Sequence, residues 1–295
     1  MTLEEVQVES EARMATTDHD QPLQKDLPAP GAGLDTSRMP GHWLLTRLGK
    51  RVLRPGGVEL TRWMLDTLDI GPDDRVVELA GGLGATAALT LRRSPAGYTA
   101  VDRDPAAVAA LSALTVPGRT HVRAVRADAS DTGLPDGSAT VVYAEAMLTM
   151  QPQPAKRRIV REARRLLTDV GGRCAIHEMC LLPDGIDPAL ADRIARDLAD
   201  TIHVGARPLT AAAWQELLTD EGFTVTARKT TPMALLEPRR MVADEGLVPA
   251  LAIARRALRD PAARRRVHEM RRVFRRHQAH LGAISLIAQP TTPTE

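Results

Sequence analysis

The sequence predicts an α/β fold with a doubly wound, mostly parallel sheet of seven strands. Hydrophobic residues make up 43% of the 295-residue chain, which is ample for a buried core. From residue 75 onward, short apolar runs alternate with longer stretches of helical periodicity. This alternation is typical of stacked strand–helix–strand units. We expect extra helices ahead of the first strand and a helical insertion before the last.

Seven apolar runs have the length of sheet strands. They are residues 76–79, 98–101, 122–127, 140–144, 173–177, 223–227 and 284–288. Helical spacing of apolar residues predicts helices at 42–53, 58–68, 85–93, 105–114, 154–167, 188–204 and 211–221, with two or three more between residues 238 and 281. Thr210 suits the N-cap of the helix at 211–221, because its hydroxyl can accept a hydrogen bond from a free N–H group.

The first 37 residues differ in composition from the rest of the chain. They mix Glu, Asp, Thr and Pro with few large apolar residues, and such a segment buries too little surface to offset the entropy of ordering. We therefore expect a disordered tail over residues 1–37 and one domain over residues 38–295. Helical cap elements are expected at 181–210 and 233–281.

Composition narrows the class of protein further. The two cysteines, Cys174 and Cys180, are too few for a disulfide framework and lack the paired spacing of a zinc site. The first residues are acidic and polar, unlike a secretory leader, and no apolar stretch approaches the ~20 residues of a membrane-spanning helix. We expect a cytoplasmic protein without a metal, and the sequence predicts no oligomeric state.

Arginine is concentrated in the last third of the chain. Between residues 255 and 280 there are ten arginines, against only Asp260 and Glu269 as acids. Most of them are expected to lie on solvated helix faces. The alternative is a surface that attracts an anionic ligand or nucleic acid.

A glycine-rich segment joins the first strand to the helix that follows it. Gly81, Gly82 and Gly84 let the backbone turn sharply and approach a ligand without a Cβ in the way. Free N–H groups at the start of the helix favour an anionic group nearby. Ala80, just before the glycines, is expected to adopt an ordinary negative φ.

Acidic residues end the next two strands. Asp102 follows the second strand, eighteen positions after Gly84, where a carboxylate can accept hydrogen bonds from both ribose hydroxyls. Asp128 follows the third strand at the same edge of the sheet. The glycine pattern alone is weak evidence, because Gly82-x-Gly84-x-x-Ala87 also satisfies the dinucleotide fingerprint of dehydrogenases.

The whole order of motifs resembles the class I S-adenosylmethionine-dependent methyltransferase family, which has a Rossmann-like fold. The resemblance covers about residues 53–289 and includes the Gly171-Gly172 turn before the fifth strand, where Asp169 and Val170 replace the usual Lys and Pro. Leu134-Pro135-Asp136 and the helices ahead of the sheet are most similar to the small-molecule branch, such as the enzymes of ubiquinone and menaquinone biosynthesis. Ala80 departs from the family, which commonly has a glycine there.

The resemblance implies a cofactor site for S-adenosyl-L-methionine. The methionine part would be held by Glu78 and the loop, the ribose by the end of the second strand and the adenine by the end of the third, with Glu145 near the methionine side. The residues implied are Glu78, Ala80, Gly81, Gly82, Gly84, Asp102, Arg103, Asp128, Ala129 and Glu145.

Methyl transfer from a sulfonium is an in-line displacement, so the protein mainly supplies alignment and a dry site. An acceptor hydroxyl or acidic carbon would also need a base, for which His177, Glu178 and His203 are candidates. Arg207 could hold an anionic acceptor. A single histidine at the end of a strand or helix is more often a solvated or hydrogen-bonded group, so these roles compete with a structural one.

Several functions stay open at this point. The favoured one is methylation of a small molecule, and the others are an RNA methyltransferase using residues 255–276, an NAD(P)-dependent oxidoreductase, and a cofactor-binding protein that has lost catalysis. Methylation of adenine N6 in nucleic acid is disfavoured, because the fourth strand leads into Ala144-Glu145-Ala146-Met147 without the Pro-Pro-aromatic motif of base-amino methyltransferases. The chain is also poor in aromatics that stack bases.

Overall fold

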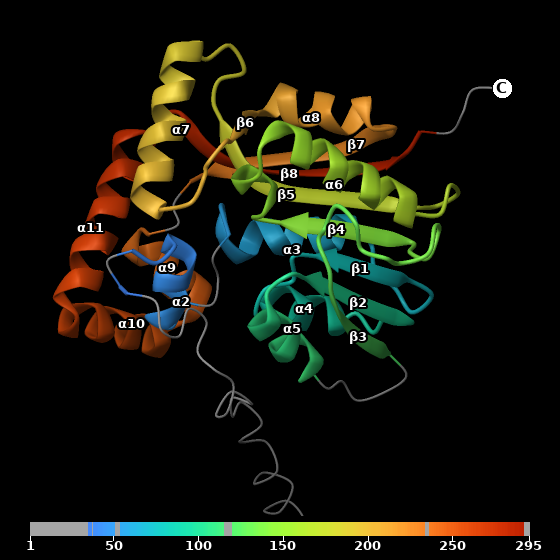
Figure 1. Ribbon diagram of the computed structural model, residues 1–295, viewed down its shortest axis with the longest axis horizontal. Helices are drawn as coiled ribbons and strands as arrows, with labels where there is room; N and C mark the ends of the chain where they lie inside the picture. The colour runs from blue at the N-terminus through green and yellow to red at the C-terminus, as the bar shows by residue number, and fades with distance from the viewer. Residues whose placement is uncertain (1–34, 37, 51–53, 115–119, 234–235, 292–295) are drawn as a thin grey trace, which may run out of the picture.

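A mostly parallel sheet forms the centre of the protein (Figure 1). The computed structural model describes residues 35–36, 38–50, 54–114, 120–233 and 236–291, so nearly all of the predicted tail lies outside the described residues. The strand order is β3-β2-β1-β4-β5-β8-β7, with β6 paired to the end of β5. Strands β1 to β5 are parallel, and β8 is antiparallel to both of its neighbours. The α/β doubly wound prediction is confirmed.

All seven predicted strands are present, and the two-residue β6 is an addition. The strands are β1 (Arg75–Leu79), β2 (Gly97–Asp102), β3 (His121–Arg126), β4 (Val141–Glu145), β5 (Arg173–Leu181), β6 (Leu209–Thr210), β7 (Phe223–Pro232) and β8 (Leu281–Pro290). The last strands are longer than their apolar runs predict. Each gains a backbone partner along the antiparallel ladder, which pairs Cys174 with Ala288 and Leu181 with Leu281.

Two layers of helices cover the sheet. Helices α6 (Gln153–Leu166) and α8 (Ala211–Asp220) pack on one face, where Trp214 is fully buried. Helices α3 (Gly57–Thr67), α4 (Ala85–Leu91) and α5 (Pro105–Ser112) pack on the other. The N-cap predicted for α8 is confirmed, because the Thr210 hydroxyl accepts a hydrogen bond from the Ala213 N–H at 3.2 Å.

A group of helices lies beside the carboxyl ends of the parallel strands (Figure 1). It comprises α2 (Gly41–Arg47), α7 (Pro188–Ile202), α9 (Pro238–Glu245), α10 (Leu247–Arg259) and α11 (Pro261–Arg276). Their apolar sides form a separate core around Leu44, Ile253 and Met270. Thus α7 lies in the first segment expected to cap the domain and α9 to α11 lie in the second. None of the described helices has the length and apolar content needed to cross a membrane.

Helix α2 is shorter than the helix predicted over residues 42–53. It ends at Arg47, Gly49 adopts a φ of +98°, and residues 51–53 lie outside the described part. The guanidinium of Arg256, from α10, donates to the Leu48 carbonyl at 3.1 Å and fills the space that a Cβ on Gly49 would need. The helix itself ends in a Schellman motif, in which the N–H groups of Gly49 and Lys50 donate to the carbonyls of Thr46 and Leu45 at 2.8 and 2.9 Å.

Candidate functional site

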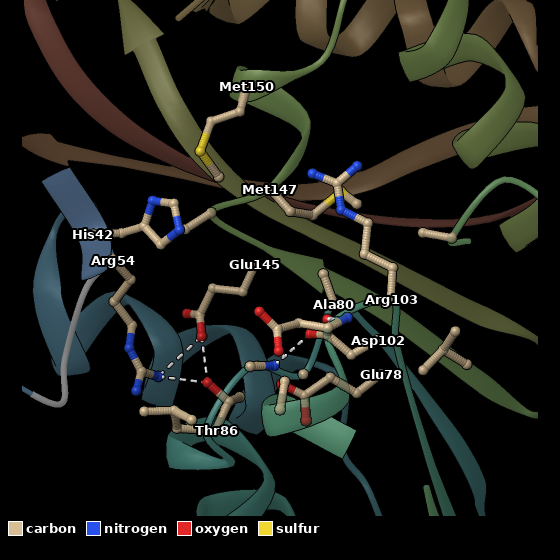
Figure 2. Close-up of a pocket in the computed structure, with 18 of the residues that line it drawn as sticks. His42, Arg54, Glu78, Ala80, Thr86, Asp102, Arg103, Glu145, Met147 and Met150 are labelled. Carbon is tan, nitrogen blue, oxygen red and sulfur yellow. Dashed lines mark hydrogen bonds and ion pairs between the residues drawn. The ribbon is translucent and has the colours of Figure 1, made fainter. Parts of the chain in front are cut away.

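A cavity of about 500 Å³ opens at the carboxyl ends of β1, β2 and β4 (Figure 2). Strand β1 lies between β2 and β4, so the chain leaves it in one direction and later returns on its other side. Ligands of doubly wound folds bind at this switch point, and the volume is in the range of small-molecule sites. Of the residues expected to bind the cofactor, these line the cavity: Glu78, Ala80, Gly81, Gly82, Asp102, Arg103, Asp128, Ala129 and Glu145.

The glycine loop is tied to the end of β2. The N–H groups of Ala80 and Gly81 both donate to the Val101 carbonyl, at 2.8 and 3.3 Å. Gly82 has a φ of +56°, and a Cβ at this position would meet open space. Gly84 differs, because a Cβ there would lie 3.1 Å from Leu114. Gly84 therefore lets the loop pack closely against the end of α5, and it does not line the cavity.

Ala80 has a φ of +59°, so the expectation of an ordinary negative φ is wrong. The left-handed region costs a residue with a Cβ roughly 1 kcal/mol or more. The paired hydrogen bonds to the Val101 carbonyl impose this turn. The replacement of the family's glycine by Ala80 is therefore a strained one, held in place by β2.

Asp102 braces the loop and also faces the cavity. Its Oδ2 accepts from the Gly82 N–H at 2.9 Å, and its Oδ1 accepts from the Asp104 N–H at 2.9 Å. Each carboxylate oxygen has two lone pairs, so each can still accept a hydroxyl from a ligand. At the end of β3, hydrogen bonds from the hydroxyl and N–H of Ser130 lower the pKa of Asp128.

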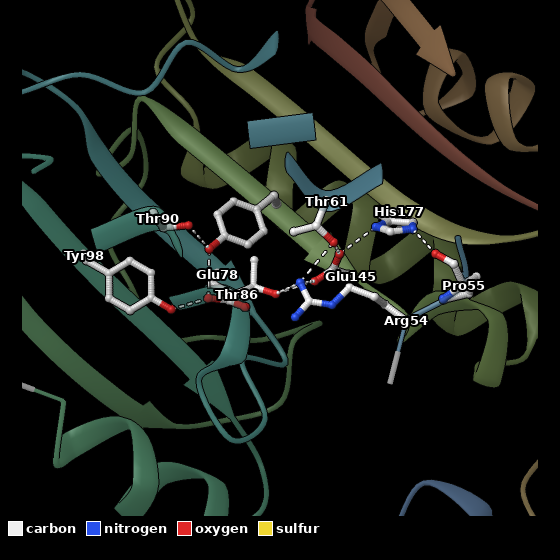
Figure 3. A network of polar contacts seen from close by, with 10 residues as sticks. Arg54, Pro55, Thr61, Glu78, Thr86, Thr90, Tyr98, Glu145 and His177 are labelled. Atoms are coloured by element: carbon white, nitrogen blue, oxygen red, sulfur yellow. Dashed lines mark hydrogen bonds and ion pairs between the residues drawn. The ribbon is translucent and has the colours of Figure 1, made fainter. Parts of the chain in front are cut away.

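Glu145 ends β4 in a buried polar network (Figure 3). Arg54 Nη1 donates to its Oε2 at 3.0 Å, and His177 Nδ1 lies 2.6 Å from its Oε1. The hydroxyls of Thr61 and Thr86 donate to the same carboxylate. Burial alone would raise the pKa of Glu145, but the charges of Arg54 and His177 and these hydrogen bonds outweigh it and lower the pKa to about 2.

His177 is fully buried and does not line the cavity. Its Nδ1 meets the Glu145 carboxylate, and its Nε2 lies 2.5 Å from the Pro55 carbonyl oxygen. Both partners are acceptors, so both contacts are hydrogen bonds only when the ring carries two N–H groups. The ring therefore joins β5 to β4 and to the segment before α3.

Glu178 is also buried, on β5, and does not reach the cavity. Its Oε1 accepts from the N–H groups of Met147 and Leu148 at 2.9 and 2.6 Å. Its Oε2 accepts from the N–H and hydroxyl of Thr149 at 3.0 and 2.6 Å. These bonds hold the single-turn helix η1 (Leu148–Met150) after β4 and so place Met147 in the cavity wall.

His203 and Arg207 do not line the cavity. His203 is the exposed C-cap of α7, with a φ of +56° and its Nδ1 3.4 Å from the Arg38 carbonyl oxygen. Arg207 is exposed, and its backbone N–H donates to the Thr149 carbonyl at 2.8 Å. Between them in sequence, only Val204 is part of the cavity wall.

Several cavity residues were missed by sequence reasoning (Figure 2). Met147 and Met150 lie on one side, and Arg54, which falls between the helices predicted at 42–53 and 58–68, lies on the other. His42 projects from α2, and its ring has no hydrogen-bond partner among the described residues. Burial lowers the pKa of His42, with Asp104 opposing the shift. No local motif marks any of these four positions.

Glu78, which lines the cavity, is almost fully buried in the polar network of Figure 3. Its Oε2 accepts hydrogen bonds from the hydroxyls of Tyr98 and Tyr143, the latter at 2.8 Å. Burial raises the pKa of Glu78 to about 7 against the opposing effect of the tyrosine hydrogen bonds. The carboxyl group therefore changes charge near neutral pH.

The Arg54–Glu145 pair should show strong coupling in a double-mutant cycle. We expect Arg54→Met and Glu145→Gln each to lower the free energy of unfolding by about 3–5 kcal/mol, because each leaves a buried charge without its ion-pair partner. The double variant should lose less than the sum, by more than about 1 kcal/mol. Urea denaturation measures all four proteins.

The exposed pair Arg164–Asp169, at 2.8 Å, serves as the matched control for this cycle. The substitutions Arg164→Met and Asp169→Asn should couple by less than about 1 kcal/mol. Equal coupling energies in the two pairs would contradict the central role of Glu145.

Glu78 should make stability depend on pH. With a pKa raised from 4.5 to about 7, the folded state binds an extra proton between these values, so stability falls as pH rises through that window. Glu78→Gln removes this dependence. The free energy of unfolding of the variant relative to the wild type should rise by up to about 3 kcal/mol from pH 4.5 to pH 7, at about 1.4 kcal/mol per unit.

Urea denaturation over a pH series tests the Glu78 effect, with Glu216→Gln on the exposed side of α8 as control. The control should differ from the wild type by a constant amount. A constant difference for Glu78→Gln as well would show that its pKa is not raised.

The sequence matches a protein-family model and a relative. Residues 76–171 match the family model described as "Methyltransferase domain". An uncharacterized protein of Haemophilus influenzae is 33% identical over 223 residues, which cover 74% of this chain and 86% of the relative. The matched model spans the glycine loop, the strand-end acids and the Gly171 turn.

Solved structures share the fold at low sequence identity. A methyltransferase from Geobacter sulfurreducens, solved in complex with S-adenosyl-L-homocysteine, is 17% identical with a TM-score of 0.60, covering 85% of this chain and 98% of that one. The MccD protein has a TM-score of 0.61 and 17% identity, over 81% of this chain and all of its own. The [4+2]-cyclase SpnF has a TM-score of 0.60 and 18% identity, over 84% and 93%.

The family model, the relative and the shared fold agree with the order of motifs along the strands. The chain belongs to the class I S-adenosylmethionine-dependent methyltransferase family.

Proposed function

We propose that this protein binds S-adenosyl-L-methionine in the cavity at the carboxyl ends of β1, β2 and β4 and methylates a small-molecule acceptor. The observation that supports this most directly is the convergence at one cavity of the glycine loop, Asp102 and Asp128, which follow three successive strands. The bound cofactor supplies an activated methyl group, and the protein aligns the acceptor for in-line displacement.

Within this proposal, Ala80, Gly81 and Gly82 form the surface against the methionine part, above the buried Glu78. Gly84 shapes the loop by packing. Asp102 accepts the ribose hydroxyls beside Arg103. Asp128 and Ala129 border the adenine. All of these except Gly84 line the cavity.

Glu145 and Arg54 act together at the methionine end. Glu145 is surrounded by its hydrogen-bond partners. Its carboxylate binds the guanidinium of Arg54 and so holds it in the cavity wall. Arg54 Nη1 makes the bonds to Glu145, Thr61 and Thr86. Among the described residues, its Nη2 makes no hydrogen bond, and it is accessible to a ligand carboxylate.

The acceptor would lie between α2 and η1, where Trp43, Met147 and Met150 provide apolar walls. His42 is the group there that suits proton acceptance, since burial keeps its ring neutral and its nitrogens are unbonded among the described residues. In this proposal His177, Glu178 and His203 have positioning or surface roles in place of the base role, and Arg207 does not contact the acceptor.

The alternative functions differ from the proposed one in the ligand that each would bind. A nicotinamide-dependent oxidoreductase would use the same loop, and an RNA methyltransferase would need the arginines of residues 255–276. The [4+2]-cyclase SpnF has this fold as well. Release of S-adenosyl-L-homocysteine during a screen of small metabolites is therefore the decisive test of methyl transfer, and turnover with RNA alone would contradict the small-molecule proposal.

Asp102 should be essential for cofactor affinity. We expect Asp102→Asn to weaken binding of S-adenosyl-L-homocysteine by about 10- to 100-fold, because hydrogen bonds to a charged group contribute about 1.5–3 kcal/mol. Isothermal titration calorimetry measures the Kd. Asp131→Asn, an exposed acid outside the cavity, is the control and should bind as the wild type does.

The same calorimetry with NAD and NADP distinguishes the cofactor classes. We expect no heat of binding from either. Tight binding of NAD with none of S-adenosyl-L-homocysteine would overturn the proposal.

His42 should titrate below the ordinary histidine value. Because burial lowers its pKa, the NMR signal of its ring proton should have a midpoint below pH 6.5. Loss of one resonance in His42→Gln identifies the signal among the eight histidines. A midpoint at or above 6.5 would remove the argument that the ring is kept neutral as a base.

A further inference from the structure

Helix α10 carries exposed apolar side chains on its outer side. Leu247, Val248, Leu251 and Leu258 are 61%, 77%, 62% and 65% exposed, and we call them the α10 apolar face. At 100° per residue, these positions fall within one third of the helix circumference. Of the large hydrophobic side chains that are exposed in the described chain, all but Val170 and Val242 belong to this face.

The inner side of α10 packs against the rest of the protein. Ala250 and Ile253 are buried, and Ile253 packs with Leu44 and Leu48 of the α2 region. The apolar face is therefore additional to the apolar surface that the fold uses. Contiguous exposed apolar patches with a polar rim are typical of interaction surfaces.

Exposed arginines without side-chain partners lie on the same helix and at the start of the next one. Arg255 and Arg259 lie on α10, on or next to the apolar face at 100° per residue, and Arg264 and Arg265 lie on the first turns of α11; their side chains make no ion pair or hydrogen bond among the described residues. Arg272, farther along α11, is also exposed and without a side-chain partner among the described residues, whereas the other five arginines of this region have partners. Arg271 and Arg275 pair with Glu237, Arg276 pairs with Asp197, and Arg256 and Arg266 donate to backbone carbonyls.

We propose that α10 binds the surface of a membrane that contains anionic lipids. The leucines and valine would enter the boundary between headgroups and acyl chains, while Arg255, Arg259, Arg264 and Arg265 bind lipid phosphates. An amphipathic helix with an apolar side and a basic rim has the chemistry of an interfacial helix.

The chemistry of the face favours this partner over two others. RNA would meet the arginines but would leave the four aliphatic side chains exposed, and the face offers no aromatic ring for base stacking. A second copy of the chain would bring the same unpartnered arginines close to each other, which repel. An anionic lipid surface satisfies the apolar and the basic residues together.

The surface is connected to the cavity by packing. Helix α2 contacts α10 through Leu44 and Leu48, and it lines the cavity with His42, Trp43 and Thr46. A bound membrane would therefore lie one helix away from the cavity wall. Lipid binding itself does not depend on the proposed methyl transfer, so the two can fail separately.

Flotation of the full chain with vesicles tests the proposal. One set of vesicles contains phosphatidylcholine alone and the other also contains phosphatidylglycerol. We expect binding to the second set that weakens as salt is raised, because the arginines are screened. Absence of binding to the anionic vesicles at low salt overturns the proposal.

Two variants separate the contribution of the apolar side chains to vesicle binding from that of the arginines. Leu247→Ser/Leu251→Ser/Leu258→Ser and Arg255→Gln/Arg259→Gln/Arg264→Gln/Arg265→Gln should each reduce partition into anionic vesicles by more than about tenfold. The matched controls, Val170→Ser and Arg62→Gln/Arg92→Gln, change exposed residues elsewhere and should float as the wild type does. Circular dichroism melts check that every variant is folded.

Two further outcomes would overturn the proposal. One is filter binding to RNA that survives the leucine variant while vesicle binding is absent in the wild type. The other is a dimer in analytical ultracentrifugation that the leucine variant dissociates, again without vesicle binding. Vesicle binding that is lost in both variants and kept in both controls supports the membrane surface.

Discussion

The carboxylate of Glu145 lies at the end of β4, and a charge buried there would cost several kcal/mol without partners. Arg54, His177, Thr61 and Thr86 supply those partners. They come from the segment before α3, from α3 itself, from α4 and from β5. One buried anion thus holds together the elements that surround this end of the cavity.

The glycine loop is coupled to this network through α4. Thr86 follows the loop directly, so the position of the Glu145 carboxylate also influences where the loop ends. At the other end, the Val101 carbonyl and Asp102 hold the loop to β2. Hydrogen bonds of this kind contribute about 0.5–1.5 kcal/mol each, which is enough to offset the strain of Ala80 in the left-handed region. The loop is therefore shaped by its neighbours on both sides.

The helices at the carboxyl edge of the sheet divide into an inner and an outer surface. The inner surface, around Leu44 and Ile253, joins α2 to α10 and so supports the cavity wall that carries His42. The outer surface holds the exposed leucines and the unpartnered arginines. Composition alone predicted solvated arginines here, but it could not separate those that pair with Glu237 and Asp197 from those that remain available.

The strand–helix alternation, the cavity-facing glycine loop and the acids at the strand ends could all be predicted from the sequence. Those features depend on short-range periodicity and on the rule that parallel strands end at one edge of the sheet. The tertiary structure alone decided the partners of His177, because its ring meets the Pro55 carbonyl 122 positions away. It likewise brought Arg54 to Glu145, 91 positions away in the sequence. Local patterns specify which elements form and at which edge they meet, whereas hydrogen bonds between distant segments specify which side chains are left free to face a ligand.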